Sequence, residues 1–113
     1  MDRKTKGIHG EAMAQRHYVD QGYEILESNY RYSRSEIDII ALKDEQILVF
    51  VEVKHRTRKD FGEPESFVSN DQQDRIKQAA EAYIFDINWQ KDIRFDIVCV
   101  DGKEKMEVFE DAF

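Results

Sequence analysis

The strongest constraint on this chain is the stretch EIDIIALKDEQILVFVEVKHR, residues 36–56, in which charged side chains interrupt two apolar runs. Residues 39–42 and 47–53 have the composition of buried strands. Asp38 immediately precedes the first run, and Glu52 lies inside the second. Because a buried carboxylate is costly unless it is paired or binds a cation, these acids predict a role beyond packing.

The two runs are predicted to pair as a hairpin. Residues 43–46 (KDEQ) form a connection short enough for a tight turn. In the first strand one face is predicted to hold Glu36, Asp38 and Ile40, and the other Ile37, Ile39 and Ala41. In the second strand one face holds Leu48, Phe50, Glu52 and Lys54, and the other Val49, Val51 and Val53. Apolar residues on both faces predict that this second strand is central and covered on both sides.

Residues 6–21 predict a helix that ends at Gly22. One arc of this helix is predicted to face the core, and its apolar members are Ile8, Ala12, Ala14, Tyr18 and Val19. Glu11 falls within the arc, whereas Met13 is predicted to point away from it. Since an acid on a buried helical stripe is unusual, Glu11 is expected to have a partner.

Further elements complete a predicted order of α-β-β-β-α-β(-β). A strand at residues 23–31 precedes the hairpin, a loop at 57–69 follows it, and strands at 93–100 and 105–109 end the chain. A second helix runs to about residue 86, with Ser69 and Gln72 as a capping box. Its predicted inward face holds Ile76, Ala79, Ala80, Tyr83 and Ile87. We therefore expect an α/β fold with one mixed sheet between two helical layers.

The chain length of 113 residues predicts a single domain spanning residues 1–113. The lone cysteine, Cys99, excludes an internal disulfide and a four-thiolate zinc site, and its apolar neighbours favour a buried, inert thiol. The N-terminal residues lack the apolar core of a signal peptide, and no run approaches the ~18 apolar residues of a membrane helix. We expect a cytoplasmic protein with no membrane partner and no organic cofactor.

The net charge of −7 argues against a nucleic-acid partner, but its distribution weakens the argument. Residues 1–59 hold 11 basic and 10 acidic side chains, and residues 60–113 hold 6 and 14. The most basic run, KHRTRK at 54–59, directly follows Glu52 and Val53. A local basic patch can bind phosphates on an acidic chain, so the charge alone does not decide the partner.

Asp38 and Glu52 lie at similar distances from the hairpin turn, so their side chains are predicted to be cross-strand neighbours roughly 5 Å apart. Two carboxylates at that separation require a proton or a cation between them. Oxygen ligands suit Mg²⁺ or Mn²⁺, and Lys54 adds a positive charge on the same face. This arrangement is typical of a phosphodiesterase, in which the metal polarises a phosphoryl oxygen and the lysine orients water or stabilises developing charge.

Each of these signals also has a purely structural explanation. Glu-x-Lys on a half-exposed strand often forms a surface ion pair, and Asp38 alone would suit a strand end. The combination of both with a helical acid favours the metal site. His9, His17 and His55 lack a ligand spacing for zinc.

An acid followed by Glu-x-Lys on consecutive strands resembles the PD-(D/E)XK nuclease superfamily, with its restriction-endonuclease-like three-layer α/β/α fold. More closely, the chain resembles the YraN-like family of small endonucleases, related to archaeal Holliday-junction resolvases. The matching segments cover nearly the whole chain: GIHGEAMA (7–14), GYEILESNYR (22–31), EIDIIA (36–41), LVFVEVKHR (48–56) and RFDIVCV (94–100).

The resemblance implies the roles of the site residues. Asp38 and Glu52 would be metal ligands, the main-chain carbonyl of Val53 a third, and Lys54 the catalytic lysine. Glu11 would match the helical acid that completes the site in resolvase-like members. Glu36 belongs to the family pattern as a ligand or a neighbour of the ligands, or else is a solvated strand-end acid.

Two positions depart from the family pattern. Ser35 replaces a glycine before Glu36, which is a mild change in a turn. Gln72 stands where the family has a lysine, so it either hydrogen-bonds a phosphate or water, or serves only the capping box. Other candidate phosphate contacts are Arg56, Arg58 and Lys59, for which a solvated loop is the alternative. Arg31 and Arg34 are expected to flank the same cleft. Asp96 fits the family, yet an ion pair with Arg94 explains it equally well.

The sequence therefore predicts a Mg²⁺- or Mn²⁺-dependent deoxyribonuclease that hydrolyses phosphodiester bonds of branched or structured DNA. The substrate class rests on the resemblance alone. The alternative is a nuclease-fold module of weak or no activity that binds nucleic acid or a protein partner. A homodimer or a structural role in an assembly is a further expectation.

Overall fold

A computed structural model describes residues 3–56, 68–103 and 105–113. The elements, in chain order, are α1 (Arg3–Asp20), β1 (Glu24–Tyr32), β2 (Ser35–Lys43), β3 (Ile47–His55), α2 (Asn70–Ile87), β4 (Asp92–Val100) and β5 (Met106–Phe109). The predicted order of elements is confirmed, with bounds that differ by a few residues. Most of the predicted loop after β3 lies outside the described residues.

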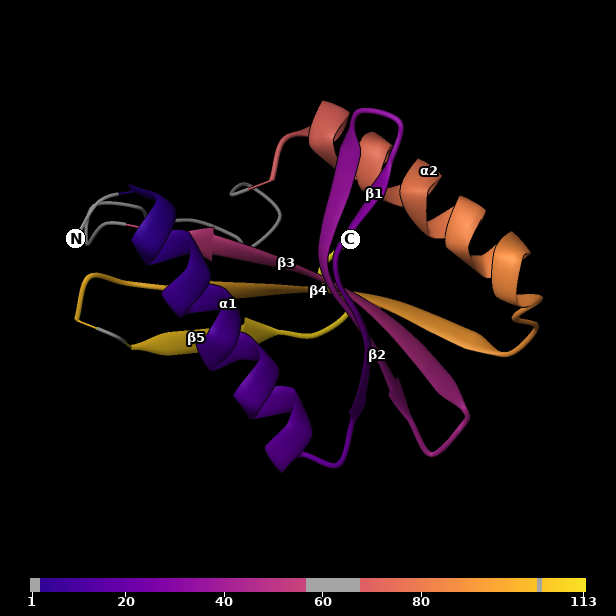
Figure 1. The fold of residues 1–113 in the computed structure, drawn as a ribbon, viewed down its shortest axis with the longest axis horizontal. Helices are drawn as coiled ribbons and strands as arrows, with labels where there is room; N and C mark the ends of the chain where they lie inside the picture. Colours follow the sequence, from indigo (N-terminus) through magenta and orange to yellow (C-terminus); the bar gives the residue numbers. More distant parts are fainter. Residues whose placement is uncertain (1–2, 57–67, 104) are drawn as a thin grey trace.

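The five strands form one mixed sheet in the order β1-β2-β3-β4-β5. Neighbouring strands are antiparallel except β3 and β4, which are parallel and are joined through α2. The two helices pack on opposite faces, so the fold has three layers (Figure 1). The predicted mixed sheet between two helical layers is confirmed, and β3 is its middle strand.

Two hydrophobic clusters fill the space between these layers. The cluster beneath α2 includes Leu48, Phe50 and Ile97, and the cluster beneath α1 includes Val49, Val51 and Val98. Consecutive residues of β3 therefore point to opposite faces, which confirms the predicted alternation and the covering of both faces. Cys99 is buried in the α2-side cluster, as predicted.

The alternation predicted for β2 is wrong at one position. Ile37 packs in the α2-side cluster, whereas Ile39 packs in the α1-side cluster, although the two were predicted to share a face. The pairs Tyr30↔Ile37 and Ser28↔Ile39 flank Asn29, whose φ is 54°. The change of face in β2 thus coincides with an irregular, left-handed residue in β1, and the sheet is distorted beside Asp38.

The buried face predicted for α1 is also partly wrong. The stripe that meets the sheet consists of Gly10, Ala14 and Tyr18, spaced four residues apart. Ile8 is 61% exposed and Val19 is 54% exposed, Ala12 is exposed as well, and Met13 packs against the core. Hydrophobic periodicity missed this rotation because Gly10 has no side chain to count.

The second helix begins and ends largely as its sequence indicates. The Ser69 hydroxyl accepts a 3.1 Å hydrogen bond from the main-chain N–H of Gln72, so the cap is confirmed. The predicted inward residues are buried except Ile87, which is 42% exposed because the helix ends there at a left-handed Asn88. Neither helix, over the part of the chain described, is long and apolar enough to cross a membrane.

A candidate metal centre where β2 and β3 part

Asp38 lies at the point where the β2–β3 ladder stops. The last paired residues are Ile39 and Val51. Beyond them, the main-chain N–H of Val53 donates a 2.7 Å hydrogen bond to Oδ2 of Asp38. A side-chain oxygen thus takes a hydrogen bond at the end of the ladder, which fixes the carboxyl group of Asp38 beside β3.

Glu52 meets this carboxyl group from β3. Its side chain is buried, and burial is the largest cause that raises the pKa of both Asp38 and Glu52 well above the ordinary carboxyl range. The charge of Asp38 raises the pKa of Glu52 further. Because two buried carboxylates repel each other, the pair favours a bound proton or a cation. The two acids predicted to converge are therefore brought together.

Two side chains lie against the Glu52 carboxyl group, Gln72 from α2 and Lys54 from β3 itself. Nε2 of Gln72 donates a 3.2 Å hydrogen bond to Oε1 of Glu52, and Nζ of Lys54 lies 3.8 Å from the same oxygen. The ammonium group lowers the pKa of both Glu52 and Asp38, although less than burial raises it. Gln72 thus contacts Glu52 directly, and its side chain does not form the second half of the predicted capping box.

Two further acids approach Asp38 from the side of α1. One carboxylate oxygen each from Glu11, Glu36 and Asp38 lie within 4.8 Å of one another. The charges of Glu11 and Glu36 both raise the pKa of Asp38. Together with Glu52, these acids form what we call the carboxylate cluster: Glu11, Glu36, Asp38 and Glu52.

The close packing of α1 on β3 positions Glu11. A Cβ atom added to Gly10 would lie 2.7 Å from Nε2 of His55 and 3.6 Å from Cγ1 of Val53. Only a residue without a side chain allows this approach without a shift of the imidazole. Gly10 was not predicted to shape the site. Its position directly before Glu11 was the one sequence feature that could have indicated this role.

The basic residues predicted to contact phosphate or to flank the cleft lie in separate parts of the fold. Arg31 pairs with Glu36 at 3.3 Å beside the carboxylate cluster, and Arg34 is exposed in the β1–β2 turn. Arg56 forms an ion pair with Glu107 of β5. Arg58 and Lys59 lie outside the described residues. For Val53, the described contact to the cluster is through its N–H; its carbonyl stays a prediction.

Asp96 belongs to a separate buried network. Both of its carboxylate oxygens accept 2.8 Å hydrogen bonds from Arg94, and Oδ2 also accepts a 2.7 Å hydrogen bond from the Tyr18 hydroxyl. Arg94 in turn donates to the Tyr23 hydroxyl at 2.9 Å. Of the two explanations for Asp96, the ion pair with Arg94 is the one observed, and it ties α1 to β4.

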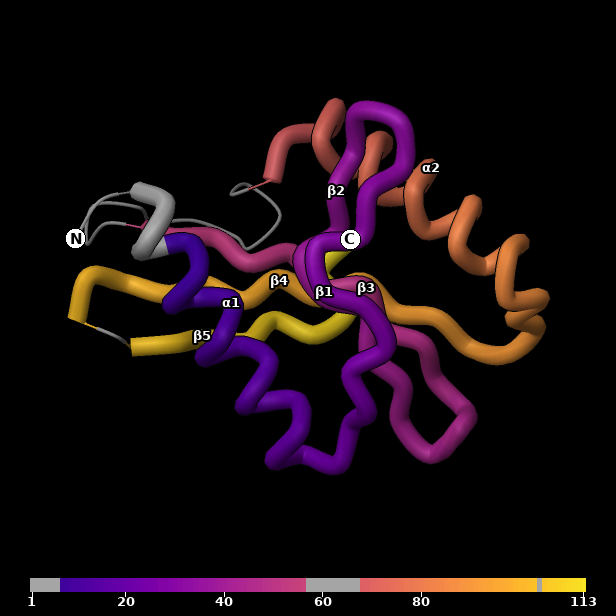
Figure 2. Tube along the Cα trace, in the orientation of Figure 1, coloured from indigo at the N-terminus to yellow at the C-terminus, as the bar shows by residue number. Residues whose placement is uncertain are grey.

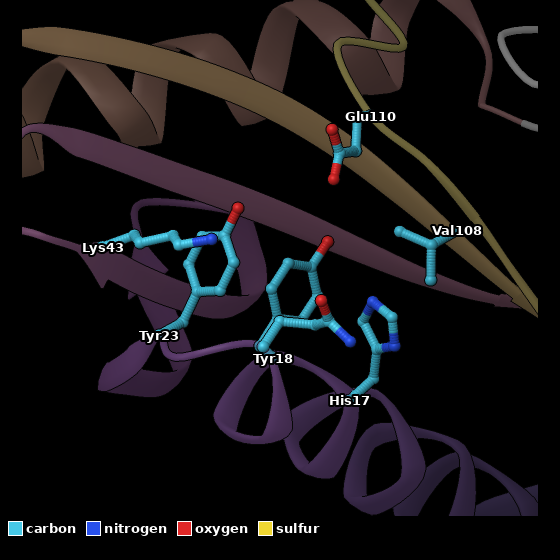
Figure 3. Close-up of a pocket in the computed structure, with 7 residues that line it drawn as sticks. His17, Tyr18, Tyr23, Lys43, Val108 and Glu110 are labelled. Carbon is cyan, nitrogen blue, oxygen red and sulfur yellow. The ribbon is translucent and has the colours of Figure 1, made fainter.

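A hollow of about 260 Å³ adjoins this network at the C-terminal end of α1. Figure 3 shows Lys43 running beside the ring of Tyr23, with Glu110 facing the two tyrosines. The hydroxyl groups of Tyr18 and Tyr23 are already hydrogen-bonded to Asp96 and Arg94. We therefore interpret this hollow as a surface feature above a structural ion pair.

The carboxylate cluster fits a hard divalent cation. All four side chains offer oxygen ligands, which Mg²⁺ and Mn²⁺ prefer. The raised pKa of Asp38 and Glu52 indicates that a positive charge would relieve repulsion within the pair. The protein is therefore a small three-layer α/β protein. Its acids and one lysine gather where strands β2 and β3 stop pairing.

Comparison with known proteins gives the family. The model of the family described as "Uncharacterised protein family UPF0102" matches residues 10–100. The chain belongs to this family, which confirms the predicted YraN-like relationship.

Similar proteins cover nearly the whole chain. A UPF0102 protein of Cytophaga hutchinsonii is 43% identical over 104 residues, covering 92% of this chain and 91% of its own length. Another from Flavobacterium psychrophilum is 44% identical over 110 residues, with 95% and 92% covered. One from Thermodesulfovibrio yellowstonii is 40% identical over 113 residues, with 100% and 99% covered.

Proposed function

We propose that this protein is a metal-dependent endonuclease that hydrolyses DNA phosphodiester bonds. The observation that supports this most is the buried contact between Asp38 and Glu52 with Lys54 beside it. A chain that needed only a stable core would place apolar residues at these positions, because a repelling acid pair destabilises the fold. The resemblance to PD-(D/E)XK nucleases supports the same reaction, and its resolvase-like members suggest branched or structured DNA as substrate.

In this proposal Asp38 and Glu52 hold a Mg²⁺ or Mn²⁺ ion, with Glu11 and the carbonyl of Val53 as further ligands. A bound cation would supply Lewis-acid polarisation of a phosphoryl oxygen. Lys54 holds its ammonium group beside Glu52, where it can orient the attacking water or stabilise negative charge that develops on the phosphate. Gln72 holds the Glu52 carboxyl group in place through a hydrogen bond. Unlike a lysine at this position, it adds no positive charge.

The test is cleavage of labelled four-way DNA junctions and supercoiled plasmid with Mg²⁺ or Mn²⁺. Glu52→Gln and Lys54→Ala should each reduce cleavage by on the order of 100-fold or more, as expected for loss of a group that acts in the transition state. Lys91→Ala is the matched control, because Lys91 contacts the main-chain oxygen of Glu45 at the β2–β3 turn, far along β2 from Asp38. Folded wild type that cleaves none of these substrates, or full activity in both site variants, would contradict the proposal.

A second candidate function is binding without catalysis. Gln72 in place of the family lysine and the net charge of −7 favour it, and Phe85 on α2, which is 85% exposed, favours a protein partner such as a second copy. Such a module would bind DNA or protein without divalent metal and would tolerate both Glu52→Gln and Lys54→Ala. Sedimentation across a range of concentrations would detect the homodimer.

A further inference from the structure

The tip of the β1–β2 hairpin, residues 31–34, carries two arginines next to the carboxylate cluster. We propose that this hairpin tip is a phosphate-binding arm, in which Arg31 and Arg34 hold the DNA backbone beside the bond to be cleaved. The inference rests on the proposed function, since it names the surface that would deliver DNA to the same site. It differs from that function in assigning a binding role to residues that hold no metal.

The hairpin tip presents its charges to solvent. Figures 1 and 2 show the hairpin rising beside α2, and Tyr32 near its tip lines a hollow with residues from the second half of that helix. Ser33 turns the chain with a φ of 58°, and Arg34 follows it as an exposed residue. The side chain of Arg31 is 80% exposed. Both guanidinium groups can therefore reach a ligand as large as a nucleic-acid strand.

Arg31 is also connected to the carboxylate cluster. It is the cross-strand partner of Glu36, and its guanidinium group lies 3.3 Å from the Glu36 carboxylate. Glu36 in turn approaches Glu11 and Asp38. An exposed ion pair of this kind is weak, so a divalent cation that attracts Glu36 would release the guanidinium group at little cost. Arginine then offers a planar fork that matches a phosphate.

The charges around the tip favour one path for the strand. Tyr32 points to the α2 side, where it lines a hollow with the acids Glu81 and Asp86. These acids would repel a phosphate backbone, whereas Arg31 points to the side of Glu36. Arg34 is four residues from Asp38 along β2, which is ~13 Å in an extended strand. The DNA would thus run along the Arg31 side of the hairpin toward Asp38.

The test measures DNA affinity against salt concentration, since each phosphate contact contributes to the slope. A labelled four-way junction and a labelled single strand are the probes, with Mg²⁺ present and Lys54→Ala in all proteins to stop cleavage. Arg31→Gln and Arg34→Gln should each reduce the slope of log affinity against log salt by about 0.7 to 0.9, and the double variant by about twice that. Lys91→Gln removes the same charge far from the site and should leave the slope unchanged.

A second measurement separates binding from support of the metal site. In the absence of DNA, Arg31→Gln should bind Mg²⁺ as tightly as the parent or more tightly, because a cation next to Glu36 has been removed. Weaker Mg²⁺ binding would overturn the proposal, because it would show that Arg31 supports the carboxylate cluster. The proposal would also be overturned if both arginine variants kept the salt slope of the parent protein. If the slopes change as expected but the protein with Lys54 intact cleaves nothing, the phosphate-binding arm is supported and the endonuclease activity is contradicted. If the parent protein binds neither probe, both proposals are contradicted.

Discussion

The N–H of Val53 and the carboxylate of Asp38 are joined by a 2.7 Å hydrogen bond at the place where β2 and β3 cease to pair. This bond holds the Asp38 carboxylate close to Glu52. Burial already disfavours the charged form of Glu52, and the charge of Asp38 disfavours it further. The metal-free protein therefore carries a repelling acid pair, and neutralising or protonating one of the two acids should increase its stability.

Neutralising Glu52 should stabilise the metal-free protein near neutral pH. Glu52→Gln removes the repulsion with Asp38 and keeps the shape of the side chain. We expect a gain on the order of 1 kcal/mol, or about 4 °C in Tm for a chain of this length, in thermal unfolding with a chelator present. Glu24→Gln, an exposed acid on β1, is the control and should change little. A sharp fall in Tm for Glu52→Gln would count against a carboxylate cluster.

The stability of the metal-free protein should fall as the pH rises through weakly acidic and neutral values. A carboxyl group whose pKa is raised on folding binds more protons in the folded state than in the unfolded state, so unfolding becomes easier as the pH increases from about 4. Added Mg²⁺ should reverse this trend at neutral pH. Thermal unfolding at pH 5 and pH 8, with and without Mg²⁺, measures it. A double variant Asp38→Asn, Glu52→Gln that keeps the same pH dependence would refute the assignment.

Removing Arg94 should destabilise the fold strongly. Asp96 is fully buried, and without the guanidinium group its charge would be left with too few partners. Arg94→Leu should cost about 3–5 kcal/mol, and Tyr18→Phe, which removes one hydrogen bond to Asp96, about 1–3 kcal/mol. Urea unfolding measures both. The double variant Arg94→Leu, Asp96→Leu should be more stable than Arg94→Leu alone, and the opposite order would contradict this account.

The effect of a methyl group at Gly10 should depend on His55. Gly10→Ala places a Cβ atom against the imidazole, but alanine also favours a helix over glycine by about 1 kcal/mol. In a His55→Ala background the contact disappears, so Gly10→Ala should then stabilise the protein by nearly that amount. Urea unfolding of the four proteins gives the coupling between the two positions. Equal effects in both backgrounds would show that the close approach has no energetic consequence.

The order of elements was predictable because each one is encoded locally. The alternation in β3, the short turn before it and the Ser69 cap depend on neighbours in the sequence. The acids Asp38 and Glu52 were identifiable because charge inside an apolar run is rare. Their convergence followed from counting outward from a single turn.

The errors arose where backbone geometry overrides the side-chain pattern. Ile37 and Ile39 lie on opposite faces of β2 at the point that faces the left-handed Asn29 of β1, and no periodic pattern encodes that break. Gly10 sets the rotation of α1 through an approach between distant segments. The pairing of Arg56, directly after β3, with Glu107 of β5 likewise joins segments that lie far apart in the sequence.

The strand order of the sheet equals the order of the strands along the chain, so β3 is an edge strand until α2 and β4 have folded onto it. Antiparallel neighbours joined by short turns form early, whereas the parallel β3–β4 contact needs the intervening helix first. Glu52 should therefore stay hydrated through much of the folding reaction and lose its water late. We expect its burial to act on the rate of unfolding, so that Glu52→Gln lengthens the lifetime of the native state and leaves the folding rate nearly unchanged.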